Sequence, residues 1–124
     1  MTVAYFCIVA ALFIPLACAG YAKFSVKGYD NRQPREFLEK LQGRSQRAHY
    51  AQLNFYETFA PFIGGVIVAH QLHAPQGRID LLAAGWIAAR ILFAIFYVQD
   101  FSRLRSIAWA LSLGLIIALF FIGA

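Results

Sequence analysis

Charge is the scarcest property of this sequence of 124 residues. Charged side chains make up 14% of the chain, against about a quarter in an ordinary soluble domain. Only six residues are acidic, and eleven Lys and Arg leave a net charge of +5. Hydrophobic residues make up 60%. This composition excludes an ordinary soluble domain and predicts a single membrane-embedded domain.

Cysteine and recognisable catalytic motifs are nearly as scarce. Cys7 and Cys18 lie in one apolar stretch, about 16 Å apart along a helix axis, which is too far for a disulfide within one chain. His70 and His73 have helical spacing, but no carboxylate or cysteine accompanies them, so we expect interfacial histidines and no metal. GxGxxG, a phosphate-binding loop, a Ser-His-Asp set and paired carboxylates are all missing.

Long apolar segments are what the sequence does have. Residues Thr2 to Tyr21 carry no charge and are long enough to cross a bilayer. A cleaved signal peptide is the alternative, but the basic start and the short apolar core of such a peptide are missing. We therefore predict a retained transmembrane helix that tolerates a kink at Pro15. With the later apolar segments, the prediction is an antiparallel four-helix transmembrane bundle with helices at about 2–21, 45–72, 79–99 and 106–122.

The basic residues predict how the chain is oriented. Seven of the eleven Lys and Arg lie between Lys23 and Arg47, mostly in the polar segment 22–44. Arg103 and Arg105, in the link before the last helix, lie on the same side. The positive-inside rule places that side in the cytoplasm and both termini outside. The cations are therefore expected to meet lipid headgroups, with no nucleic acid as partner, and Phe37 begins an apolar stripe that predicts a short amphipathic helix at 36–41.

Polar side chains are placed on one face of the second helix. Arg47, Asn54 and Glu57 are spaced by seven and three residues, within a sector of roughly 80°. Glu57 and Arg90 are the only charges deep in apolar segments, where an unpaired charge is costly. Two interpretations follow. The two charges form an ion pair between the second and third helices, or, with Asn54 and Tyr97, they line a cavity for a polar or zwitterionic ligand.

Arg105 and Ser106 lie at the cytoplasmic mouth of this predicted cavity. An arginine held there stabilises a thiolate or a developing anion, and a serine hydroxyl donates a hydrogen bond to sulfur. The alternative is that Arg105 is only one of the basic residues that set the topology.

This pattern resembles the MAPEG family, the membrane-associated proteins of eicosanoid and glutathione metabolism. Its most specific part resembles the second helix of the family, with an N-x-x-E-x-x-x-P-F motif. A second group of residues resembles the bacterial branch of the family, and a third resembles its third helix and the link to the fourth. The resemblance covers nearly the whole chain. The residues concerned are Asn54, Glu57, Pro61 and Phe62 for the motif, Asp30, Asn31, Pro34, Arg35, Arg47 and Ala48 for the branch, and Arg90, Tyr97, Arg105 and Ser106 for the third helix and the following link.

The resemblance implies a homotrimer in the bacterial inner membrane with glutathione bound at each subunit interface, open to the cytoplasm. It implies that Arg47, Asn54, Glu57, Arg90 and Tyr97 bind glutathione. Glu57 would take the amino end, Arg90 would bind or order a carboxylate, and Tyr97 would close over the peptide. Lipophilic small molecules would arrive from the membrane lipid.

The resemblance also implies the chemistry and its alternatives. Arg105, with Ser106, would stabilise the glutathione thiolate that attacks a lipophilic electrophile, as in a transferase or peroxidase. Tyr50 stands where animal members usually have an arginine that contacts glutathione. A non-catalytic protein of the same fold that binds lipid or a partner is the second hypothesis. A small drug exporter is a third, but Thr2 to Tyr21 lacks the buried carboxylate which that class requires.

Overall fold

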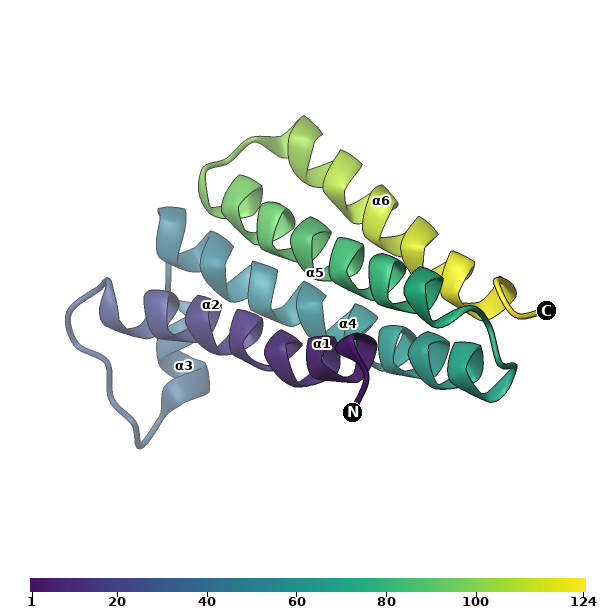
Figure 1. Ribbon diagram of the computed structural model, residues 1–124. Coiled ribbons are helices and arrows are strands. Elements are labelled where there is room, and N and C mark those ends of the chain that lie inside the picture. The colour runs from purple at the N-terminus through teal and green to yellow at the C-terminus, as the bar shows by residue number, and fades with distance from the viewer.

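Helices make up nearly all of the computed structural model, which describes residues 1–124 and contains no strand. The longer helices lie side by side along a common direction, and the short helix packs beside one end of them (Figure 1). The elements are α1 (Val3–Ala11), α2 (Phe13–Phe24), α3 (Pro34–Glu39), α4 (Gly43–Gln71), α5 (Gln76–Val98) and α6 (Ser102–Phe121).

The first apolar segment is two helices rather than one. It is interrupted at Leu12, whose N–H bonds to the Val9 carbonyl at 3.1 Å instead of continuing the regular ladder. Pro15 explains the position, because it has no N–H for the carbonyl of Ala11 and its ring crowds that carbonyl. The interruption changes the packing partner: α1 lies mainly against α5, whereas α2 lies mainly against α4.

The links between the last three long helices are tight turns closed by the same hydrogen-bond pattern. After α5, the Phe101 N–H bonds to the Phe96 carbonyl at 2.9 Å, and Asp100 has a positive φ of 64°. After α4, the Ala74 N–H bonds to the Ala69 carbonyl at 3.1 Å, and His73 has φ 55°. These are Schellman motifs, which satisfy the last carbonyls of each helix and reverse the chain. The last helix therefore begins at Ser102, four residues before the expected 106, and it includes Arg105.

The polar segment between α2 and α4 contains the short helix α3. It begins at Pro34, two residues before the expected 36, because proline suits the first turn of a helix. Its apolar stripe covers the polar end of the long helices. Phe37 and Leu38 of the stripe pack against a small cluster formed by Ala22, Leu41 and Ala48.

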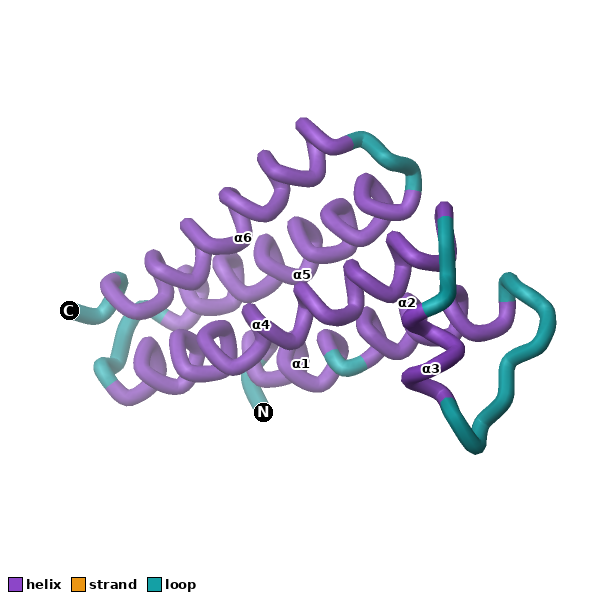
Figure 2. Tube along the Cα trace, turned by 180° about the vertical axis from the view of Figure 1, so that it is seen from behind, coloured by secondary structure: helices purple, strands orange, loops and turns teal.

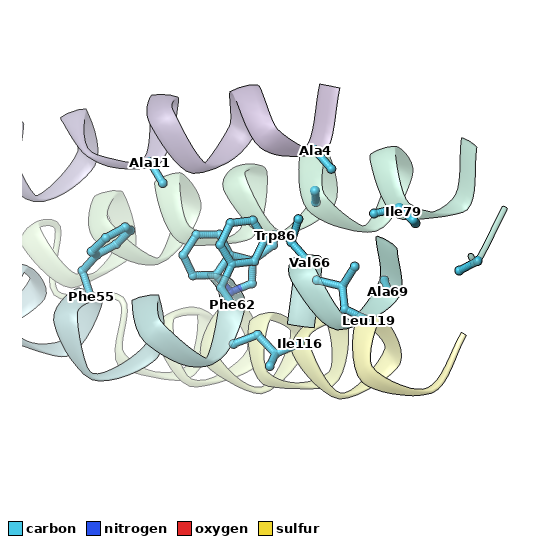
Figure 3. Packing of buried hydrophobic residues seen from close by; sticks show 12 residues of the cluster. Ala4, Ala11, Phe55, Phe62, Val66, Ala69, Ile79, Trp86, Ile116 and Leu119 are labelled. Carbon is cyan, nitrogen blue, oxygen red and sulfur yellow. The ribbon is translucent and has the colours of Figure 1, made fainter. Parts of the chain in front are cut away.

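The core lies at the opposite half of the molecule and is built around two stacked aromatic rings (Figure 3). The rings of Phe62 and Trp86 are 3.8 Å apart and nearly parallel, and both side chains are fully buried. Gly65 lets α4 and α6 approach closely, since an added Cβ there would lie 3.0 Å from the Leu119 Cβ. Small residues serve this purpose where helices pack inside a bilayer.

The outer surface carries many large apolar side chains. Phe6, Leu81, Ile107 and Phe121 are all more than half exposed. Three helical segments are long and apolar enough to cross a membrane: Val3–Phe24, Gln76–Val98 and Ser102–Phe121, with mean hydropathies of 2.3, 2.0 and 2.0. Helix α4 is the longest, and its first half carries the polar side chains that the sequence singles out.

Candidate functional site

A cavity of about 320 Å³ lies where the first half of α4 meets the end of α5 and the start of α6. Figure 2 shows these three helices side by side from behind. The cavity brings together four of the residues singled out from the sequence. It is lined by Asn54 from α4, Phe93 and Tyr97 from α5, and Arg105, Ser106 and Trp109 from α6.

Arg105 and Ser106 reach the cavity from the first two turns of α6. The N-terminus of a helix carries partial positive charge, which adds to the charge of the Arg105 guanidinium. The Arg105 guanidinium lies over the ring of Tyr97, with 4.5 Å between the guanidinium carbon and the ring centroid. This cation–π contact holds the arginine half-buried at the wall. The arrangement places a fixed positive charge beside a hydroxyl group, which suits an anion.

Arg90 lies behind the cavity and does not line it. Its side chain is 1% exposed, with the guanidinium carbon 4.1 Å from the centroid of the Phe93 ring. It makes one hydrogen bond, in which the Arg90 Nη2 donates to the Asn54 Oδ1 at 2.8 Å. Its Nε and Nη1 have no partner. Arg90 therefore acts on the cavity through Asn54, whose amide it holds in one orientation.

Glu57 and Arg90 form no ion pair, so the first of the two interpretations from the sequence does not hold in this chain. The Glu57 side chain is exposed, and its Oε2 lies 3.5 Å from the Asn54 Nδ2. That distance is at the limit of a hydrogen bond. The three residues form a row from the buried cation through the amide to a carboxylate with no cationic partner. A carboxylate without a cationic partner is costly on a helix inside a membrane.

Arg47 lies away from the cavity although it shares the helix face of Asn54. It is about 10 Å further along the α4 axis, and its Nε donates to the Val98 carbonyl at 3.1 Å. This bond fixes the end of α5, one residue after Tyr97. Of the seven site residues expected from the sequence, Asn54, Tyr97, Arg105 and Ser106 line the cavity, Arg90 and Glu57 contact Asn54, and Arg47 stands apart.

Comparison with protein families decides the membership of the chain. The family model described as the MAPEG family matches residues 1–124. The chain belongs to the MAPEG family. No curated protein and no solved structure matches it. Together with the three apolar helices, membership identifies an integral membrane protein from a family that is generally associated with glutathione.

Two residues that line the cavity of this MAPEG protein were not predicted from the sequence. Phe93 and Trp109 each lie four residues from a residue that was singled out, Tyr97 and Arg105 respectively. That spacing puts each on the same helix face as its neighbour, so the sequence did carry the signal. Neither aromatic side chain is among the residues singled out from the sequence. They make one wall of the cavity apolar.

A second hollow of this MAPEG chain, about 400 Å³, lies between α3 and α4. It faces away from the cavity, since Gln52 lies about 160° around α4 from Asn54. Four of its six lining residues carry polar side chains: the lining consists of Arg35, Leu38, Glu39, His49, Gln52 and Leu53. The two sides of α4 therefore carry different polar surfaces within the same half of the helix.

Proposed function

We propose that this MAPEG protein is a membrane-bound glutathione-dependent transferase or peroxidase acting on lipophilic electrophiles. The observation that carries the proposal is the cavity in which Arg105 and Ser106 face Asn54 and Tyr97. A volume of about 320 Å³ is within the range of small-molecule sites. One wall offers charge and hydrogen bonds for a peptide thiol, and the aromatic wall suits an apolar reactant.

In this proposal the residues that line the cavity, together with Glu57 beside Asn54, divide the work between binding and chemistry. Asn54 and Glu57 hold polar groups of glutathione, and Glu57 takes its amino end. Tyr97 closes over the peptide. Arg105, with the Ser106 hydroxyl, stabilises the thiolate left when the thiol proton passes to solvent water, because a charge already held in place stabilises an anion without the reorientation that water needs. The thiolate then forms the S–C bond, and the negative charge passes to the leaving group or opened ring.

The burial of Arg90 refines its expected role. With 1% of its side chain exposed, it orders the ligand site by fixing the Asn54 amide. It is thus a positioning residue and does not itself grip a carboxylate. Arg47 is available to a ligand carboxylate only from the polar rim, where its Nε is already engaged by Val98.

We further propose that three copies assemble with the site between neighbours. In a closed ring each interface joins two different surfaces. This chain has two candidate surfaces: the cavity side of α4 with Glu57, and the hollow between α3 and α4 with Arg35 and His49. A neighbour that brings its Arg35 surface against Glu57 would supply the missing cation. Native mass measurement in detergent should give a trimer, and a clean monomer would remove the interface site.

The membrane arrangement in this proposal has four crossings, with α4 as the fourth beside the three apolar segments. The basic segment 22–44 and the start of α6 would face the cytoplasm of a bacterial inner membrane, with both termini outside. The cavity would then open toward the cytoplasm, where glutathione is available, while its aromatic wall faces substrates arriving from the bilayer.

A non-catalytic lipid- or partner-binding protein is the second candidate. The observation in its favour is Tyr50, which stands in place of an arginine expected to contact glutathione. The Tyr50 side chain is exposed and does not line the cavity. Its hydroxyl accepts a hydrogen bond from the Gln46 Nε2 at 3.1 Å. One cation fewer at the site weakens binding of an anionic peptide.

The experiment that separates the two candidates measures glutathione affinity and conjugation on detergent-solubilised protein. Glutathione should bind, and Arg105→Ala should lower the rate of conjugation to a chloronitrobenzene by roughly a hundredfold while changing the affinity far less. Arg103→Ala is the matched control, because Arg103 is exposed on the same helix and lines no cavity. If the wild type neither binds nor conjugates glutathione, the non-catalytic candidate replaces the enzyme.

A further inference from the structure

An apolar groove runs along the outside of the molecule between α2 and α5. It consists of two adjoining hollows of about 400 and 250 Å³ that share four lining residues. The inner hollow is lined by hydrophobic residues alone, among them Phe13, Ile87 and Ile91. The outer one continues past Cys18 to Tyr21 and Gln99. The groove therefore leads from the middle of the apolar helices to their polar end.

The break before Pro15 explains why the groove exists. Because the chain changes direction at Leu12, α1 stays against α5 while α2 turns onto α4. The space between α2 and α5 is left unfilled, and small side chains keep it open, Ala17 from α2 and Ala94 from α5. Measured from Ile87 to Gln99 on α5, the groove is about 18 Å long. One leaflet of the hydrocarbon core is about 15 Å thick, so the length matches one acyl chain.

The polar end of the groove carries positive charge that nothing in the chain neutralises. The Arg44 Nη2 donates to the Gln99 Oε1 at 3.3 Å, and the Arg47 Nε donates to the Val98 carbonyl at 3.1 Å. Gln99 and Val98 both line the groove. Neither arginine is paired with a carboxylate, and the nearby Asp100 bonds to neither. Two cations held by hydrogen bonds beside an apolar slot are complementary to a phosphate attached to an acyl chain.

We propose that this groove binds one anionic glycerophospholipid, with an acyl chain between α2 and α5 and its phosphate at Arg44 and Gln99. The site is separate from the cavity at Arg105, with which it shares no lining residue. It does not depend on glutathione. The lipid fills the space left by the break and neutralises the charge of Arg44 and Arg47 at the start of α4.

The first test is native mass spectrometry of delipidated protein titrated with dioleoylphosphatidylglycerol or dioleoylphosphatidylcholine. We expect one saturable phosphatidylglycerol per chain, bound at least tenfold more tightly than phosphatidylcholine. Arg44→Gln should remove most of that preference. Ala17→Phe should fill the groove and abolish saturable binding. Ala110→Phe is the matched control, an exposed alanine on α6 away from any hollow, and it should bind like the wild type.

The second test measures protection of a native groove residue, Cys18, in a chain whose groove lining is unchanged. In Cys7→Ser, the remaining Cys18 lines both hollows, so phosphatidylglycerol should slow its alkylation by N-ethylmaleimide severalfold. In Cys18→Ser, alkylation of Cys7 should not change. Equal binding of the two lipids, unprotected Cys18, or a change of oligomeric state in Ala17→Phe would each overturn the proposal. The last result would mean that a second copy of the chain covers the groove.

Discussion

The bond between Arg90 and Asn54 makes a prediction that can be worked out from the structure. In Asn54→Ala the guanidinium loses its one hydrogen bond, and every N–H on a side chain that is 1% exposed is left without a partner. A hydrogen bond to a charged group contributes about 1.5–3 kcal/mol. We therefore expect Asn54→Ala to lower the free energy of unfolding by about 2 kcal/mol, without any ligand present.

Arg90→Leu is the companion variant, and it should remove the energetic cost that Asn54→Ala exposes. Arg90→Leu removes the charge together with its unpartnered N–H groups, and exchanging a buried ionic group for a hydrophobic one of similar size is often neutral. In the Arg90→Leu background the Asn54→Ala substitution should therefore cost little. The double-mutant cycle should give a coupling of about 2 kcal/mol.

The measurement is unfolding in mixed micelles with rising dodecyl sulfate, followed by far-ultraviolet circular dichroism. Gln46→Ala is the control on the same helix, since its amide reaches only the Tyr50 hydroxyl at 3.1 Å on an exposed face. It should change stability by no more than about 0.5 kcal/mol. If Asn54→Ala has an effect as small as that of Gln46→Ala, or if the cycle is additive, the proposed hold of Arg90 on Asn54 is wrong.

Two further predictions concern the packing of the helices. Gly65→Leu should destabilise the fold by about 1–3 kcal/mol, because its side chain would meet Leu119, whereas Gly114→Leu, with open space around it, should be tolerated in the same unfolding assay. Asp80→Ala should cost about 1–2 kcal/mol, because the Asp80 Oδ1 accepts the Ala4 N–H at 2.9 Å and ties the start of α1 to α5. A stability like that of the wild type in either case would refute the corresponding contact.

Much of the helical layout follows from the sequence, because an uncharged run such as Thr2–Tyr21 must satisfy its backbone internally when it lies in a membrane. The exact ends do not follow. The kink expected around Pro15 appears one turn earlier, at Leu12. The start of α6 depends on Asp100 adopting a left-handed conformation, which aspartate tolerates better than most residues. Propensity alone does not show which polar residue after α5 will close the turn.

The sequence predicts which residues belong to the candidate site better than it predicts which of them contact one another. Helical spacing placed Asn54 with Glu57, and Tyr97 with Arg90, but spacing within one helix says nothing about rotation between helices. The structure pairs Arg90 with Asn54 rather than with Glu57, and it puts Arg105 over Tyr97. These contacts depend on how α4, α5 and α6 rotate against one another. That rotation is set by buried packing such as the stack of Phe62 on Trp86.

The two tryptophans give the protein two separate optical reporters. Trp86 is fully buried in the stacked core, whereas Trp109 is 41% exposed and lines the cavity. Blue-shifted emission from the first tracks the integrity of the fold, while quenching or a spectral shift of the second tracks occupancy. With Trp86→Phe, a fluorescence titration reads a bound molecule directly, so any candidate compound can be screened without knowing the reaction in which it takes part.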